Sequence, residues 1–181
     1  TEIGYDSQKS YSNGFYDVDL DVVFTHSDGT EFTVPAFWNG GNQWKVRFAP
    51  TLTGEWTCRT ICSDETNSSL HDQRDTFNCE SYTGDLALYR QGFVRTTPGN
   101  RYFTYADGTP FFYLGDTHWN ICVNSYENFK TIIDKRVEQR STVIQSEPIG
   151  TGYTLWDGFS ETDLLGFARM DERFRYVAEH G

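Results

Sequence analysis

A strict alternation of acidic and apolar residues runs through Asp17-Val18-Asp19-Leu20-Asp21-Val22. When the pattern is extended to Phe24, the apolar side chains fall on one face and the aspartates on the other. Because successive side chains of a strand point to opposite faces, this period of two predicts a strand buried on one side. The polar segment His26–Gly29 follows and has the composition of a turn.

The same alternation returns three more times, separated by turn residues, in the segments 32–38, 44–48 and 56–62. The inward-facing positions of these runs include Trp38, Trp44 and Trp56. Thr76–Cys79 resembles a returning strand. Short strands at this spacing are typical of a sandwich or a barrel. We therefore expect residues 1–83 to form an antiparallel, immunoglobulin-like β-sandwich.

The pattern changes near Tyr82–Asp85, which we take as the domain junction, and a short hairpin is expected before residue 106. Phe111–Leu114 is continuously apolar, as in a strand covered on both faces. A helix with its apolar stripe on Phe129, Ile132, Ile133 and Val137 follows. Ser141–Gln145 reads as a second buried strand. This order predicts a βαβ unit with parallel strands.

A second helix is predicted from the spacing of Phe167, Met170, Phe174 and Val177. Two parallel strands do not make a complete sheet, since such sheets are found buried in larger α/β folds. We interpret residues 84–181 as the N-terminal portion of a parallel α/β, TIM-barrel-like domain, truncated before its third strand. This portion is a fragment, or it self-associates and completes its core against another chain.

Several stretches resemble a known pair of domains. Residues 11–80 are similar to a functionally uncharacterised β-sandwich domain that precedes bacterial glycosidase-like barrels. Residues 84–181 are similar to the start of the barrel of the apiosidase-like family. The stretches that carry the resemblance are Tyr11–Asn13, Phe15–Val18, Val34–Gly40, Trp44–Pro50, Gly54–Thr57, Gly92–Arg95, Tyr105–Phe112, Leu114–Trp119 and Val143–Gln145.

The resemblance implies a (β/α)8 barrel and a glycoside hydrolase of plant cell-wall, pectic-type polysaccharide, because the family includes enzymes that release apiose from pectin. It also implies that the catalytic carboxylate pair lies on later strands. We therefore assign no catalytic residue in this chain and expect it to be inactive by itself. The alternative is a non-catalytic carbohydrate-binding or structural β-sandwich module, including one that only braces the barrel.

Barrel active sites lie at the carboxyl ends of the strands. Asp116 follows the first predicted strand, His118 and Trp119 are beside it, and Gln145 ends the second. We predict that these four residues bind carbohydrate through hydrogen bonds to hydroxyls and stacking on a sugar ring. The alternatives are a turn-capping Asp116, a core Trp119 and a satisfied buried Gln145. An aromatic-rich loop follows, with Tyr153, Trp156 and Phe159.

The net charge of −11 disfavours nucleic acid or an anionic membrane as a partner. No apolar run approaches 18 residues, so no transmembrane helix is expected. No motif indicates a cofactor or a metal, and the four cysteines form no CxxC pair. Two alternatives remain for the cysteines: free thiols, or a disulfide bridge from Cys58 or Cys62 to Cys79. We expect a soluble bacterial protein, either cytoplasmic or exported after removal of a signal.

Overall fold

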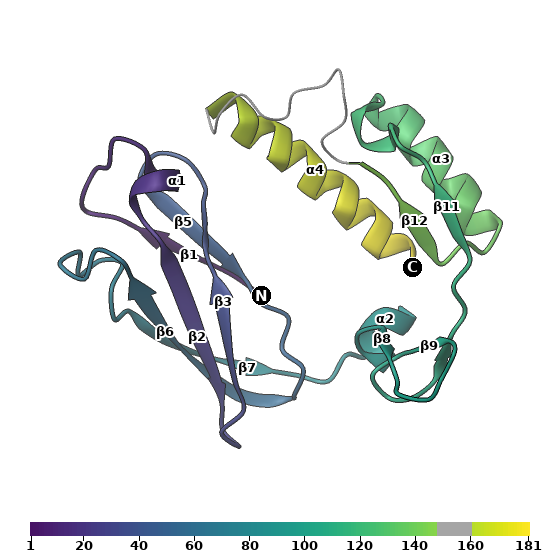
Figure 1. The fold of residues 1–181 in the computed structure, drawn as a ribbon, viewed down its shortest axis with the longest axis horizontal. Helices are drawn as coiled ribbons and strands as arrows, with labels where there is room; N and C mark the ends of the chain where they lie inside the picture. Colours follow the sequence, from purple (N-terminus) through teal and green to yellow (C-terminus); the bar gives the residue numbers. More distant parts are fainter. Residues whose placement is uncertain (148–160) are drawn as a thin grey trace. The chain divides into compact units, whose positions relative to one another are not determined.

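The computed structural model describes residues 1–147 and 161–181 (Figure 1). The chain divides into two compact units, Thr1–Ser81 and Tyr82–Gly181, and each is described separately below. Most of the sheet in the described residues is antiparallel, and long helices occur only in the second unit.

The first unit contains two antiparallel sheets (Figure 1). The strands of the larger sheet are, in spatial order, β3 (Glu31–Pro35), β2 (Leu20–His26), β6 (Gly54–Cys62) and β7 (Arg74–Cys79). The smaller sheet has the order β1 (Glu2–Asp6), β5 (Gln43–Arg47) and β4 (Phe37–Trp38). A one-turn helix, α1 (Gly14–Asp17), precedes β2.

The two sheets share a core that follows the predicted alternation. Val22 and Phe24 of β2 pack with Trp56 and Cys58 of β6 and with Val46 of β5, and all five side chains are buried. A second cluster contains Val18, Leu20, Trp44, Cys62 and Leu70. The inward-facing positions predicted in β2, β5 and β6 are therefore confirmed. Burial of their apolar surface stabilises this unit.

Two strand boundaries differ from the prediction. Residues 17–19 precede β2, because Asn13 caps α1 by accepting hydrogen bonds from the backbone N–H groups of Phe15 and Tyr16. The run 32–38 does not form a single strand: β3 pairs with β2 in one sheet and β4 pairs with β5 in the other. The crossover lies at Ala36, whose N–H donates to the Leu20 carbonyl at 2.7 Å. The strand β1 was not predicted.

The polar loop after β6 is anchored to the N-terminal segment. Asn67 is buried and donates hydrogen bonds to Ser7 Oγ and Tyr11 Oη. The Asp64 carboxylate accepts from Lys9 Nζ at 2.8 Å and from Tyr11 at 2.9 Å. These bonds, the one from Lys9 above all, hold the pKa of Asp64 well below its usual range. The loop is thus ordered by hydrogen bonds.

All four cysteines are free thiols. Cys58 and Cys62 are buried inward-facing residues of β6, and Cys122 is buried in the second unit. Burial raises the pKa of the Cys58 and Cys62 thiols. The fold therefore does not rely on a covalent cross-link.

The second unit begins with the short helix α2 (Ala87–Gln91) and a small antiparallel sheet of β8 (Arg95–Thr96), β9 (Phe103–Thr104) and β10 (Pro110–Phe111). Then follow β11 (Gly115–Thr117), the 3-10 helix η1 (Ile121–Val123), α3 (Tyr126–Glu138), β12 (Val143–Gln145) and α4 (Glu161–His180). β11 and β12 are paired in parallel.

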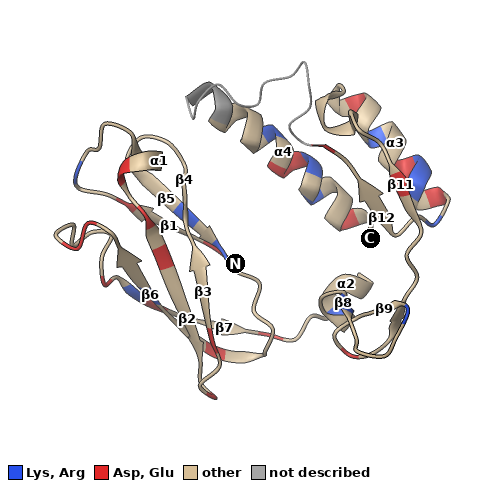
Figure 2. Ribbon diagram, viewed as in Figure 1, with Lys and Arg blue, Asp and Glu red and all other residues tan. Residues whose placement is uncertain are grey.

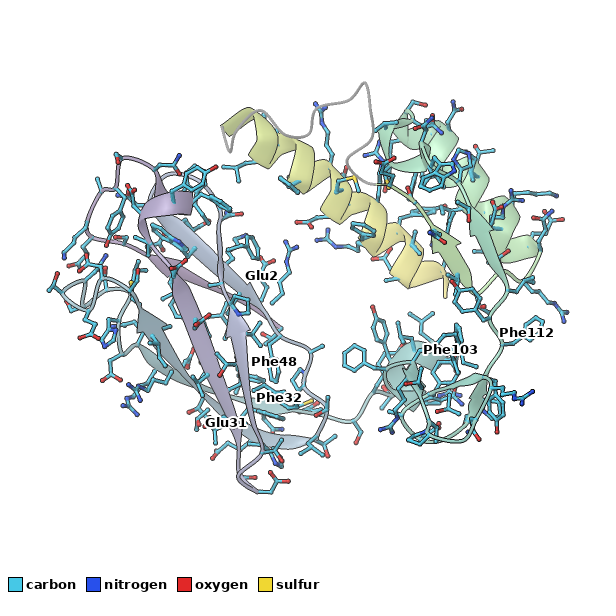
Figure 3. The ribbon with its side chains drawn as sticks, in the orientation of Figure 1. Glu2, Glu31, Phe32, Phe48, Phe103 and Phe112 are labelled. Atoms are coloured by element: carbon cyan, nitrogen blue, oxygen red, sulfur yellow. The ribbon has the colours of Figure 1, made fainter. Side chains whose placement is uncertain are left out.

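The prediction of two adjacent parallel strands is confirmed, but the predicted bounds of the first strand are wrong. Residues 110–111 pair antiparallel with β9, and the parallel strand begins only at Gly115. Phe112, Tyr113 and Leu114 are exposed, with Phe112 73% exposed (Figure 3). An apolar run without alternation does not show where one strand ends and the next begins.

The two long helices pack on one another and on the parallel strand pair (Figure 1). Ser125 caps α3 by accepting from the Asn128 N–H, and Phe129 and Ile133 enter the core. In α4, Met170 is buried, whereas Phe167 and Phe174 are exposed. Among the described residues, no helix combines the length and the apolar character that a bilayer crossing requires.

Stability of the first unit should depend strongly on Phe24. Its buried ring stacks on Phe48 with centroids 4.1 Å apart. We expect Phe24→Ala to lower the free energy of unfolding by about 3–5 kcal/mol, measured by urea denaturation. Phe32 lies directly opposite on β3 and is 38% exposed, so Phe32→Ala is a matched control that should cost under about 2 kcal/mol (Figure 3). Equal losses would contradict the described core.

The end of β2 contains a titratable contact. His26 Nδ1 lies 2.9 Å from Asp28 Oδ1, and Nε2 lies 3.0 Å from the Thr53 carbonyl oxygen. A protonated ring donates to both acceptors, so the pKa of His26 is raised, chiefly by the bond to Asp28. Backbone N–H donation from Thr30, together with His26, lowers the pKa of Asp28 to about 2.

We therefore predict that the first unit loses stability as the pH rises from about 6.5, the ordinary pKa of histidine, through the raised pKa of folded His26. The contribution is complete below the unfolded value and is lost when the folded ring deprotonates. The readout is the urea midpoint between about pH 5 and 9. His26→Gln should remove this part of the slope, and identical pH profiles for both proteins would refute the assignment.

Candidate functional site

The carboxyl ends of β11 and β12 lie side by side and form the candidate site. Asp116 pairs with Ile144, and Thr117 pairs with Gln145. The ladder continues past the strands, since the His118 N–H donates to the Gln145 carbonyl at 2.8 Å. The Glu147 N–H donates to the Trp119 carbonyl at 3.3 Å. All four predicted site residues therefore lie near the carboxyl end of the strand pair.

Asp116 faces the helices. Its Oδ2 accepts a hydrogen bond from Arg136 Nε of α3 at 2.7 Å, and each side chain of this ion pair is about one-third exposed. Ile144, opposite Asp116, packs against the core formed with α3 and α4. Arg136 also donates to Gln139 at 2.7 Å, and acidic and basic residues are intermixed along α3 (Figure 2). The carboxylate thus fixes helix to strand.

Gln145 lies on the other face of the strand pair. Because side chains alternate along a strand, Thr117 and Gln145 project opposite to Asp116 and Ile144, and both are exposed. The sequence analysis missed Thr117, which sits beside Gln145 and offers a hydroxyl. It also missed Arg136, the partner of Asp116. The strand register places Thr117 beside Gln145, and the packing of α3 places Arg136 beside Asp116; neither is visible in the sequence.

His118 and Trp119 extend the edge beyond β11. His118 is half-buried, and Trp119 is 59% exposed, so its ring is available for contact with a ligand. The Trp119 carbonyl also accepts from Ser146 Oγ at 3.5 Å, which ties this residue to the end of β12. Of the alternatives raised by the sequence, a core position for Trp119 does not occur.

The predicted aromatic loop with Tyr153, Trp156 and Phe159 lies outside the described residues. A cavity of about 590 Å³ also occurs in the second unit, and none of the four predicted residues lines it. Within residues 1–147 and 161–181, no group of three or more His, Cys, Asp or Glu side chains is arranged to hold a metal ion.

Two family models each match part of the chain. Residues 97–158 match the apiosidase-like catalytic domain family. Residues 1–63 match a family described as "Domain of unknown function (DUF5060)". These matches confirm the resemblance predicted from the sequence, and the apiosidase-like match contains β11, β12 and all four predicted site residues. A search of curated proteins gives no match.

A solved structure has the same fold. It is the crystal structure of a "putative glycoside hydrolase" from Bacteroides vulgatus ATCC 8482, with a TM-score of 0.80 and 19% sequence identity. The match covers 100% of the present chain and 38% of the solved chain. The present chain therefore spans well under half the length of that protein.

The Asp116–Arg136 pair predicts a measurable coupling. In a double-mutant cycle with Asp116→Asn and Arg136→Gln, we expect a coupling energy of about 0.5–1 kcal/mol from thermal or urea unfolding. The more exposed pair Lys135–Glu138 on the same helix is the matched control and should couple by about 0.3 kcal/mol. Coupling at Asp116 no greater than in the control would argue against the described contact.

Proposed function

We propose that this chain is the N-terminal part of a glycoside hydrolase that acts on plant cell-wall, pectic-type polysaccharide. The observation that carries the proposal is the parallel pairing of β11 with β12 inside the segment that matches the apiosidase-like catalytic domain. In barrel enzymes the carboxyl ends of such strands build the active site. The fold match to a protein described as a "putative glycoside hydrolase" supports the same activity class.

We propose that the two halves have different tasks. Residues 1–83 form an immunoglobulin-like β-sandwich, supported by two antiparallel sheets with a common core. Residues 84–181 form the first part of a (β/α)8 barrel, before its third strand, and the order β11, α3, β12, α4 supports this. The sandwich serves a structural role toward the barrel, because Trp44 and Trp56 are buried in its core.

The burial of these tryptophans also weighs against the alternative, a carbohydrate-binding sandwich. Such a module would display a row of aromatic rings on one face. The exposed large apolar residues of the first unit are instead Phe15, Tyr16, Phe32, Leu52 and Ile61. They come from a helix, two strands and a loop. The second unit is therefore the better candidate for substrate contact.

Each of the four predicted site residues has a proposed role in substrate binding. The exposed Trp119 ring stacks on the apolar face of a sugar. The Gln145 amide both donates to and accepts from hydroxyls, and His118 adds a ring nitrogen beside it. Asp116 contributes from the helix side of the edge, where the ion pair with Arg136 holds its orientation. Thr117 offers a further hydroxyl next to Gln145.

We propose that the catalytic carboxylates are absent from this chain. Hydrolysis of a glycosidic bond requires two carboxyl groups, about 5–5.5 Å apart in retaining enzymes and about 6.5–9.5 Å apart in inverting ones. Asp116 is engaged by Arg136, and its neighbour across the ladder is Ile144 rather than an acid. Later barrel strands would supply the acid/base and the nucleophile.

Carbohydrate binding tests the proposal directly. We expect the chain to bind pectic oligosaccharides more tightly than cello-oligosaccharides in isothermal titration calorimetry. Trp119→Ala should weaken binding about fivefold, because an aromatic contact is worth about 1 kcal/mol. Phe112→Ala, another exposed aromatic of the same unit, is the matched control and should leave binding unchanged. Equal effects of both variants, or no binding of pectic sugars, would overturn the assignment.

Turnover provides an independent test. We expect these 181 residues to release no sugar from apiose-containing pectic polysaccharide, measured by chromatography of the products. A longer form that includes further barrel strands should release it. Turnover by the 181-residue chain would contradict the proposed absence of the carboxylate pair.

A further inference from the structure

The junction between β10 and β11 is a three-residue turn. β10 pairs antiparallel with β9, whereas β11 pairs in parallel with β12. Between them the Leu114 N–H donates to the Phe112 carbonyl at 3.2 Å, which closes a γ-turn centred on Tyr113. A uniformly apolar run does not specify where such a turn falls, so a contact from elsewhere in the chain has to hold it.

The hydroxyl of Thr142, the residue before β12, makes that contact. Its Oγ1 accepts from the Leu114 N–H at 3.0 Å and donates to the Phe112 carbonyl at 2.5 Å. The Thr142 backbone N–H also donates to the Leu114 carbonyl at 2.9 Å. A hydroxyl can donate and accept at the same time, so this one side chain binds both ends of the turn.

The register of the parallel ladder starts at this turn. The ladder is short, running from Gly115 opposite Val143 to Thr117 opposite Gln145. The Leu114 carbonyl accepts from the Val143 N–H at 3.3 Å, so the contacts of Thr142 and the beginning of the ladder meet at Leu114. Because the pair is short and the preceding run is uniformly apolar, alternation along the strand gives this register little support.

The candidate site depends on the register. Asp116 faces α3 and bonds to Arg136, whereas Gln145 lies on the opposite face. A slip of one residue moves every side chain of a strand to the other face and displaces it by about 3.3 Å along the strand. Such a slip would turn Asp116 away from Arg136 and would move Trp119 relative to Gln145.

We propose that Thr142 is a positioning residue for the candidate site. Its hydroxyl fixes the junction between β10 and β11, and thereby the register that presents Trp119 and Gln145 together. Thr142 acts through the backbone ladder, whose far end is the bond from the His118 N–H to the Gln145 carbonyl at 2.8 Å. The consequence for sugar binding rests on the proposed function, whereas the effect on the register does not.

Amide hydrogen exchange, followed by NMR, tests the effect on the register. Thr142→Val keeps the shape of the side chain and removes both hydroxyl bonds. We expect it to speed exchange about tenfold at Leu114 and at His118, the two ends of the ladder, because two hydrogen bonds are lost. Exchange at Phe129, within α3, should stay within about twofold. A merely local contact would change Leu114 alone, so unchanged exchange at His118 would refute the proposal.

Two further variants serve as controls. Thr142→Ser retains the hydroxyl and should restore the wild-type exchange at Leu114 and His118. Thr131→Val removes a comparable bond, from the Thr131 hydroxyl to the Glu127 carbonyl at 2.9 Å on α3, and should leave both amides unchanged. A serine variant as disturbed as the valine variant, or equal effects of Thr131→Val and Thr142→Val, would contradict the assignment.

The wild-type chain offers a measurement that needs no variant and holds even if Thr142→Val does not fold. A hydroxyl bonded at both ends of the turn holds the side chain in one χ1 rotamer, which scalar couplings of Thr142 should report. Couplings averaged between rotamers would show that the hydroxyl does not hold the turn.

Sugar binding tests the consequence for the site. If the competent register falls to about a tenth of the population, Thr142→Val should weaken binding of pectic oligosaccharides about tenfold in calorimetry, and Thr142→Ser should bind like the wild type. Unchanged binding by Thr142→Val, despite faster exchange at Leu114 and His118, would refute the positioning role. If the wild-type chain binds no pectic sugar but exchange responds as expected, the proposed function fails and the role of Thr142 in the register stands.

Discussion

The second unit depends on the parallel ladder between β11 and β12. The Thr142 N–H donates to the Leu114 carbonyl at 2.9 Å at one end, and the His118 N–H donates to the Gln145 carbonyl at 2.8 Å at the other. This register decides which side chains share a face. It turns Ile144 toward the helices and the core, and it leaves Gln145 and Thr117 exposed on the opposite face. The arrangement of the candidate site is a consequence of this register.

The first unit shows how far one-sided burial can be read from a sequence. Val22, Phe24, Trp44 and Trp56 were predicted to face inward, and they do, because period-two alternation reports burial directly. Pairing between strands that are distant in the chain has no corresponding pattern in the local sequence. The strand β1 lies beside β5 through contacts across some forty residues, as between Glu2 and Lys45. The change of sheet at Ala36 likewise depends on a bond to Leu20.

The candidate site could be predicted only in part. That the two strands end together followed from the βαβ order of the chain. Which side chains share a face could not be predicted, because Phe111–Leu114 is uniformly apolar and shows no alternation. Asp116 therefore lies on the helix side, bound to Arg136, while Gln145 lies on the other. An arginine twenty positions away on a helix enters the site through tertiary packing, which local sequence does not encode.

The free thiols of the first unit have a further consequence. A thiol reacts as its thiolate, and burial raises the pKa of Cys58 and Cys62, which lowers the reactivity of both while β6 stays paired. Cys62 lies opposite Leu20 and Cys58 opposite Phe24, at two levels of the same strand. Cys79 sits partly exposed at the end of β7. The rates at which a thiol reagent labels these three cysteines would therefore distinguish opening of the centre of the sheet, at Cys58 and Cys62, from fraying of its margin at Cys79.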